Sequence, residues 1–73
     1  MTSTEEEIKI TTEYITLGQL LKLAKVVSEG GQVKAYLAQG VSKVNGVPEA
    51  RRGKKLRPGD VVELPDRLIK VVS

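Results

Sequence analysis

Five basic side chains crowd into seven consecutive positions of the sequence. They occupy the run R-R-G-K-K-L-R, from Arg51 to Arg57. Clustered guanidinium and ammonium groups bind polyanions because they release condensed counterions, and Arg can contact one phosphate through two hydrogen bonds. Gly53 within the run lacks a Cβ, so a phosphate could come close to its backbone. We interpret the run as a phosphate-binding loop, and the alternative is a solvated loop that only keeps the protein soluble.

A second candidate anion site is Gly30-Gly31-Gln32, at the predicted start of a helix. Backbone N–H groups and the helix dipole attract anions at such a position, although the same residues are also typical of a tight turn. Lys22, Lys25 and Lys34 are weak indications one by one, because lysines on helix surfaces are commonly just solvated. They gain weight from sharing a basic segment with the loop.

Charge is distributed unevenly along the chain. Residues 1–14 carry four Glu and one Lys, whereas the segment from Lys22 to Arg57 carries nine Lys or Arg and two Glu, a net charge of +7. Segregated positive charge indicates a polyanion or an anionic surface as the partner. With two Tyr and no Phe or Trp, the chain cannot build the aromatic platform of single-strand readers. Binding should therefore depend on phosphates and shape.

The absence of Cys and His removes several chemistries. Without them a chain has no disulfide, zinc-thiolate site, thiol nucleophile or imidazole base. Glu49, Asp60 and Glu63 show no pairing suited to acid–base work, and Ser28 and Ser42 have no His to activate them. We therefore expect no catalytic residue, no metal, no cofactor and no small-molecule substrate, and we predict that the protein is not an enzyme.

The length of 73 residues suits one small domain over residues 1–73, with residues 1–6 as an end that can fray. No apolar run reaches the length of a membrane span, and the acidic start lacks the pattern of a signal peptide. We expect a monomeric cytoplasmic protein with no membrane partner.

Hydrophobic spacing predicts the elements that position these residues. Residues 7–14 alternate as a half-buried strand does, and Thr16 with Gln19 forms a capping box that starts a helix. Lys22 and Lys25 fall off the apolar stripe of this helix and should face solvent. The stripe consists of Leu17, Leu20, Leu21, Ala24 and Val27.

A second helix is predicted from Gly30 to Gln39, with Gly40 as a left-handed stop. The Gly30-Gly31 pair should supply the positive φ angles that separate the two helices. Asn45-Gly46 is a strong hairpin signal, and R-P-G-D at 57–60 is a further turn. The strand predictions for this half are 41–44, 47–51, 61–64 and 68–72.

Two long stretches of the sequence resemble a known family. They are L-G-Q-L-L-K-L-A-K-V-V-S-E-G-G-Q-V-K-A-Y-L and V-N-G-V-P-E-A-R-R-G-K-K-L-R-P-G-D-V-V-E. Both are similar to the S-four RNA-binding domain, also called the alpha-L motif, and closest to its free-standing bacterial form of the YaaA type. The resemblance implies an α+β fold, with a two-helix corner packed on a small bent antiparallel sheet and here an extra N-terminal strand. One departure is Ser42-Lys43, where the family usually places apolar residues.

The resemblance also implies a function and a site. It implies a non-enzymatic binder of structured RNA, with ribosomal RNA as the expected target, acting in ribosome assembly or on ribosomal particles. The alternative is a protein-interaction adaptor that uses the same small fold and its acidic N-terminal strand. Carried over by position, the expected RNA-binding residues are Lys22, Lys25, Gly30, Gly31, Gln32, Lys34, Arg51, Arg52, Lys54 and Lys55.

Overall fold

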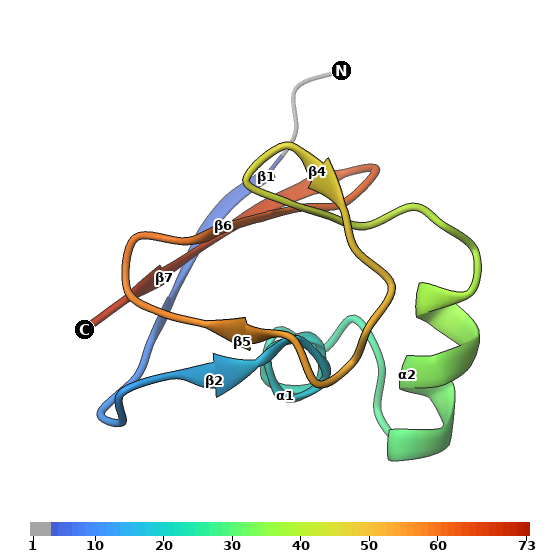
Figure 1. The fold of residues 1–73 in the computed structure, drawn as a ribbon, viewed down its shortest axis with the longest axis horizontal. Coiled ribbons are helices and arrows are strands. Elements are labelled where there is room, and N and C mark those ends of the chain that lie inside the picture. The colour runs from blue at the N-terminus through green and yellow to red at the C-terminus, as the bar shows by residue number, and fades with distance from the viewer. Residues whose placement is uncertain (1–3) are drawn as a thin grey trace.

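Two helices lie beside two small sheets in the computed structural model, which describes residues 4–73 (Figure 1). The helices are α1 (Leu17–Leu23) and α2 (Gly30–Leu37). The larger sheet has the strand order β1-β7-β6-β3-β4, and the smaller sheet pairs β2 with β5. The predicted architecture of a two-helix corner on a small sheet is confirmed. Of the end predicted to fray, residues 1–3 lie outside the described residues.

The larger sheet is mixed. Its antiparallel part runs from β7 (Arg67–Val72) through β6 (Val61–Glu63) and β3 (Lys43–Val44) to β4 (Val47–Pro48). The extra N-terminal strand β1 (Thr4–Lys9) lies parallel to β7. Strands joined by a tight turn must run antiparallel, whereas β1 and β7 come from opposite ends of the chain and no turn sets their direction. The sheet therefore differs from the antiparallel expectation at this one edge.

The first strand ends earlier than the predicted range of 7–14. Its ladder continues to the bond from the Ile10 N–H to the Val72 carbonyl oxygen, 2.8 Å, and then the chain bends. The Thr12 hydroxyl donates to the Tyr14 carbonyl oxygen across 2.9 Å within this bend. The alternating pattern of residues 7–14 predicted a half-buried strand, but Thr12 and Tyr14 are exposed.

The smaller sheet follows the bend. In it β2 (Ile15–Thr16) pairs antiparallel with β5 (Lys55–Leu56) and leads directly into α1 (Figure 1). The predicted capping box starts the helix: the Gln19 N–H donates to Thr16 Oγ1 across 3.3 Å, and the Thr16 N–H donates to Gln19 Oε1 across 3.1 Å.

α1 ends before the apolar stripe does. Lys25 adopts a left-handed φ of 60°, and the N–H groups of Lys25 and Val26 donate back to the carbonyl oxygens of Lys22 and Leu21. This is a Schellman ending, in which the left-handed residue is usually Gly. Lys22 and Lys25 are both exposed, as predicted, but Lys25 lies beyond the helix and not on it.

α2 covers most of the predicted range and stops at Leu37. Gly40 has a φ of 71°, which confirms the predicted left-handed stop. The role predicted for the Gly30-Gly31 pair is wrong at Gly31, which lies inside the helix without a positive φ. The left-handed turn between the helices is made by Lys25 instead.

The core lies between the helices and the sheets. The apolar stripe of α1 is buried there as predicted, together with Val33 and Leu37 of α2 and the inner side chains of β6 and β7. Asn45 and Gly46 have φ values of 52° and 83°, so the predicted tight hairpin forms between β3 and β4. Ser42 is buried, and its hydroxyl donates to the Glu49 carbonyl oxygen across 2.8 Å. A polar residue is tolerated at this position because its hydrogen bond is satisfied.

Candidate nucleic-acid interface

The basic loop is held against the first turn of α1. The Leu17 N–H donates to the Lys54 carbonyl oxygen across 2.8 Å, and the Gly18 N–H donates to the Arg52 carbonyl oxygen across 2.9 Å. The first N–H groups of a helix have no partner inside the helix, so the loop satisfies two donors that would otherwise need water. The segment between β4 and β5 accordingly runs past the start of α1 (Figure 1).

Gly18 allows this close approach. It is buried, and a Cβ built on it would lie 3.3 Å from the Arg52 carbonyl oxygen and 3.3 Å from Val33 Cγ1 of α2. The absence of a side chain therefore lets α1, α2 and the loop meet at one point. Gly18 is not among the residues predicted from the sequence. The available signal was a glycine inside a helical pattern, which lowers helix stability and so usually has a packing reason.

Two open hollows lie on either side of the loop. The corner hollow, about 300 Å³, contains Lys22 of α1 and Arg52 of the loop in its lining. Two predicted segments that are far apart in the sequence thus meet in this hollow. The rest of its lining consists of Thr16, Gly18, Gln19, Val33 and Gly53.

The loop hollow, about 480 Å³, is lined almost entirely by basic side chains. They are Arg51, Lys54, Lys55 and Arg57, with Gly53 between them. Arg57 belongs to the basic run but not to the predicted site residues. Gly53 lines both hollows, has no positive φ, and a Cβ built on it would meet no atom within 4 Å. The fold itself therefore does not require glycine at this position.

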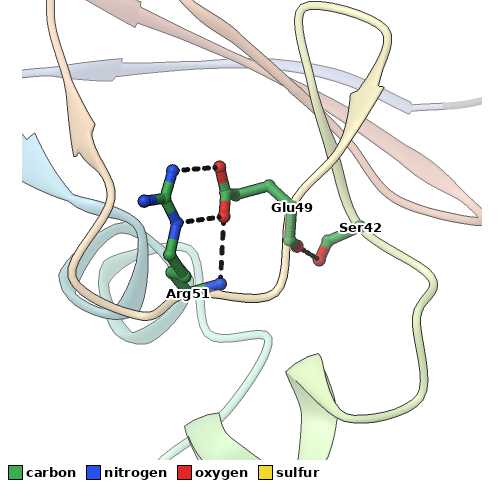
Figure 2. A network of polar contacts seen from close by, with 3 residues as sticks. All are labelled: Ser42, Glu49 and Arg51. Atoms are coloured by element: carbon green, nitrogen blue, oxygen red, sulfur yellow. Dashed lines mark hydrogen bonds and ion pairs between the residues drawn. The ribbon is translucent and has the colours of Figure 1, made fainter.

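Arg51 is not an independent cation. Its Nε and Nη2 donate to Glu49 Oε2 and Oε1 across 3.0 and 3.2 Å, and its backbone N–H donates to Oε2 across 3.1 Å (Figure 2). These hydrogen bonds lower the pKa of Glu49 to about 2. The bonds from the Arg51 side chain contribute most, and the bond from its backbone N–H contributes less. The sequence analysis treated Glu49 only as a scattered carboxylate, so it missed that Glu49 orients the start of the loop.

The other end of the loop is held by the two predicted turns. Asp60 accepts hydrogen bonds from the Arg57 N–H across 2.8 Å and from Asn45 Nδ2 across 3.1 Å. The hydrogen bond from the Arg57 N–H lowers the pKa of Asp60 most, and the bond from Asn45 lowers it less. Partial burial acts in the opposite direction and raises this pKa. The hairpin and the R-P-G-D turn are thus joined, and this junction lies directly after the end of β5.

Some of the predicted residues make contacts outside the two hollows. Lys55 places its Nζ 4.9 Å from the ring centroid of Tyr14. Gln32 accepts hydrogen bonds at Oε1 from the backbone N–H and the hydroxyl of Ser28, across 2.9 and 3.0 Å, so its amide oxygen is used within the turn. Gly30 begins α2. Exposed residues of the predicted set that line neither hollow are Lys25, Gly31, Gln32 and Lys34.

Residues 4–73 contain neither a cluster of metal ligands nor a membrane-spanning helix. No group of three or more acidic side chains is arranged to hold a metal ion within that range. Neither helix in it is long and apolar enough to cross a membrane.

Comparison with known proteins decides the family. The model of the S4 domain matches residues 8–72, nearly the whole chain. The chain belongs to the S4 domain family. The resemblance drawn from the sequence is therefore confirmed, and the matched range includes every predicted site residue.

Two proteins illustrate what this S4 domain is similar to. A probable ribosome maturation protein from Bacillus subtilis, RlbA, is 54% identical over 57 residues, which cover 78% of this chain and 80% of the relative. The solution structure of YbcJ from E. coli, described as revealing an alpha-L motif involved in RNA binding, superposes with a TM-score of 0.67 at 27% identity. That match covers all of this chain and 91% of YbcJ.

Proposed function

We propose that this S4 domain binds structured RNA through the corner hollow and the loop hollow, and that the RNA is ribosomal. The supporting observation is that the first turn of α1 holds the loop, so Lys22 and Arg52 line one hollow. Arg51, Lys54, Lys55 and Arg57 line the next. The description of YbcJ favours RNA binding, and the name of RlbA favours a role in ribosome maturation and therefore in the cytoplasm.

Phosphates are the part of an RNA that this arrangement suits. Cations spaced along a surface displace counterions from several phosphates together, and the resulting affinity depends strongly on salt. Gly53 leaves open space between the two hollows, so a backbone phosphate can approach the loop there. The family resemblance extends the proposed surface to Lys25, Lys34 and the start of α2, where Lys25, Gly31, Gln32 and Lys34 are exposed.

A gel-shift series with folded ribosomal RNA tests the proposal. About five phosphate contacts predict a slope of roughly −4 for log affinity against log salt. Replacing Arg52, Lys54 and Lys55 by Ala should flatten the slope by two to three units, since each lost contact removes roughly one unit. The matched control is Lys70→Ala, an exposed cation of β7 that lies beside acidic residues. Equal slopes for wild type and the triple variant would remove the loop from the site.

The ribosomal part of the proposal has its own test. The protein is sedimented with ribosomal particles from a lysate, and an excess of transfer RNA is added as competitor. This experiment compares two structured RNAs at one salt concentration. Retention on the particles supports a ribosomal target. Complete displacement of the protein from the particles by transfer RNA would mean that it binds structured RNA in general.

A protein-interaction role is the second candidate, favoured by the edge strand β1. Glu5 and Glu7 are exposed on it, and the hollow beside it contains Glu5, Glu6 and Glu7. An acidic sheet edge can pair with a basic extended segment. Partners that persist after ribonuclease treatment, and that are lost in a Glu5→Lys, Glu7→Lys variant, would favour this role.

A further inference from the structure

A third hollow adjoins α1, and its lining combines apolar and basic residues. This bend hollow, about 470 Å³, lies between the bend that follows β1 and the outer face of α1. Its lining includes Lys9, Tyr14, Gln19, Lys22 and Leu23. Tyr14 and Leu23 are 38% and 58% exposed, and both count among the large apolar side chains that the fold leaves in solvent. The bend hollow therefore combines apolar surface with ammonium groups.

The bend hollow is continuous with the proposed RNA surface. Gln19 and Lys22 line both the bend hollow and the corner hollow. Lys55, which lines the loop hollow, places its ammonium over the ring of Tyr14. An RNA strand held by the two basic hollows would thus pass beside the bend hollow.

The chemistry of the bend hollow suits one nucleotide. A base needs an apolar or aromatic surface for its face and donors for its edge, and its phosphate needs a cation. Tyr14 and Leu23 can supply the surface, and Lys9 and Lys22 the cations. The capping box holds Gln19 Oε1 against Thr16, which leaves the amide NH₂ group to donate. No Asp or Glu belongs to the lining formed by the described residues.

We infer that the bend hollow binds a single unpaired nucleobase of the RNA, stacked against Tyr14 and Leu23, with its phosphate between Lys9 and Lys22. This inference rests on the proposed function. The scarcity of aromatic residues rules out a platform for several stacked bases, but one half-exposed ring is enough for one base.

The test uses two RNA hairpins with the same stem, one of which carries a single bulged 2-aminopurine. At low salt, we expect the whole protein to bind the bulged hairpin roughly tenfold more tightly, within the range measured for stacking one base on an aromatic side chain. The fluorescence of the 2-aminopurine should fall on binding. Leu23→Ser and Tyr14→Ala should each remove the preference and the quenching, with the salt slope unchanged.

The control is Val47→Ser, which removes an apolar side chain that is 64% exposed and outside the bend hollow. It should keep both the preference and the quenching. If circular dichroism shows that Tyr14→Ala does not fold, the result for Leu23→Ser alone tests the base site. The base site would be overturned if binding depended on salt but showed no preference for the bulge. It would also be overturned if quenching persisted in Leu23→Ser. Either result would leave the proposed phosphate binding intact. Failure of both hairpins to bind would count against the proposed function as well.

Discussion

Glu49 reduces the charge of the basic loop while giving it shape. Its carboxylate binds both the side chain and the backbone N–H of Arg51, and its own carbonyl oxygen accepts from Ser42 (Figure 2). The Arg51 side chain is 77% exposed and that of Glu49 is 13% exposed, so the pair lies at the edge of solvent. A phosphate that approaches Arg51 finds the Nε–H and one Nη2–H already bonded to Glu49, and the charge of Arg51 already partly balanced.

Glu49→Gln should therefore change affinity and stability in opposite directions. Removing the carboxylate charge leaves one more uncompensated cation, so RNA affinity should rise two- to threefold at low salt. The free energy of unfolding should fall by about 1 kcal/mol, since a pair this exposed is worth little more. Glu63→Gln, a half-buried carboxylate on β6, is the matched control. Weaker RNA binding by Glu49→Gln would show that loop geometry matters more than the charge of Arg51.

The lowered pKa of Glu49 also predicts that the free energy of unfolding depends on pH in the acid range. Its pKa is about 2 in the folded protein, below its ordinary value of 4.5, so the stabilisation that it provides is fully present above pH 4.5. That stabilisation is lost as the pH falls toward 2. Urea unfolding at intervals across this window should show wild type converging with Glu49→Gln. A constant difference at all pH values would contradict the assigned pair.

Gly18 sets how closely the helices and the loop approach. Gly18→Val should lower the free energy of unfolding by about 1–3 kcal/mol, because the added atoms overpack Arg52 and Val33. Gly31→Val is the matched control, since a Cβ at Gly31 meets no atom within 4 Å. Thermal unfolding of both variants measures the difference. Equal stabilities would mean that the loop moves aside easily.

At the scale of the elements, the end of α1 is the least expected feature. The left-handed position of its Schellman ending is occupied by Lys25, although Gly takes that conformation without steric cost. Local preference would place the turn at the Gly-Gly pair five residues later. The structure turns earlier, where Arg67 Nη2 donates to the carbonyl oxygen of the buried residue Ala24 across 2.6 Å and so satisfies an acceptor at the end of the helix.

Lys25→Gly should consequently stabilise the protein. The strain of a side chain at positive φ is about 1 kcal/mol, and glycine's greater freedom in the unfolded chain offsets part of that gain. We expect a net gain of about 0.5 kcal/mol in urea unfolding, and a loss of similar size for Lys25→Val, whose branched side chain suits this conformation least. A loss of stability in Lys25→Gly would mean that the Lys25 side chain itself stabilises the corner.

At the scale of the whole molecule, Arg67 joins both ends of the chain to the helices. It lies on β7, donates from Nε and Nη2 to the two carboxylate oxygens of Glu6 on β1, and reaches the end of α1. These contacts raise the pKa of Arg67 and lower that of Glu6, mainly through the hydrogen bonds between the two side chains. β1 is thus connected to the end of α1 through Arg67, in addition to its ladder with β7.

Arg67→Ala should lower the free energy of unfolding by about 2 kcal/mol, since it removes charged hydrogen bonds at a site where the Arg67 side chain is 21% exposed. Hydrogen exchange should show β1 losing protection first. Lys70→Ala on the same strand is exposed and should change stability by less than about 0.5 kcal/mol. Unchanged protection of β1 would show that the parallel ladder holds it without Arg67.

Much of this protein follows from local sequence. The capping box at Thr16, the Asn45-Gly46 hairpin and the apolar stripe of α1 depend on neighbours a few residues apart, so the sequence predicts them and the structure confirms them. The family could also be read directly from motifs of this kind. Local patterns fail where a distant residue intervenes, as at Lys25, whose conformation depends on a turn capped by Arg67.

Only the tertiary structure decided which charges meet. Lys22 and Arg52 share a hollow because two helix N–H groups bind loop carbonyls, and Gly18 leaves room for that approach. Arg51 is neutralised by Glu49, and the bend hollow exists because β1 stops at Lys9. Sequence spacing specifies contacts along an element, whereas the meeting of separate segments depends on packing that no single segment encodes.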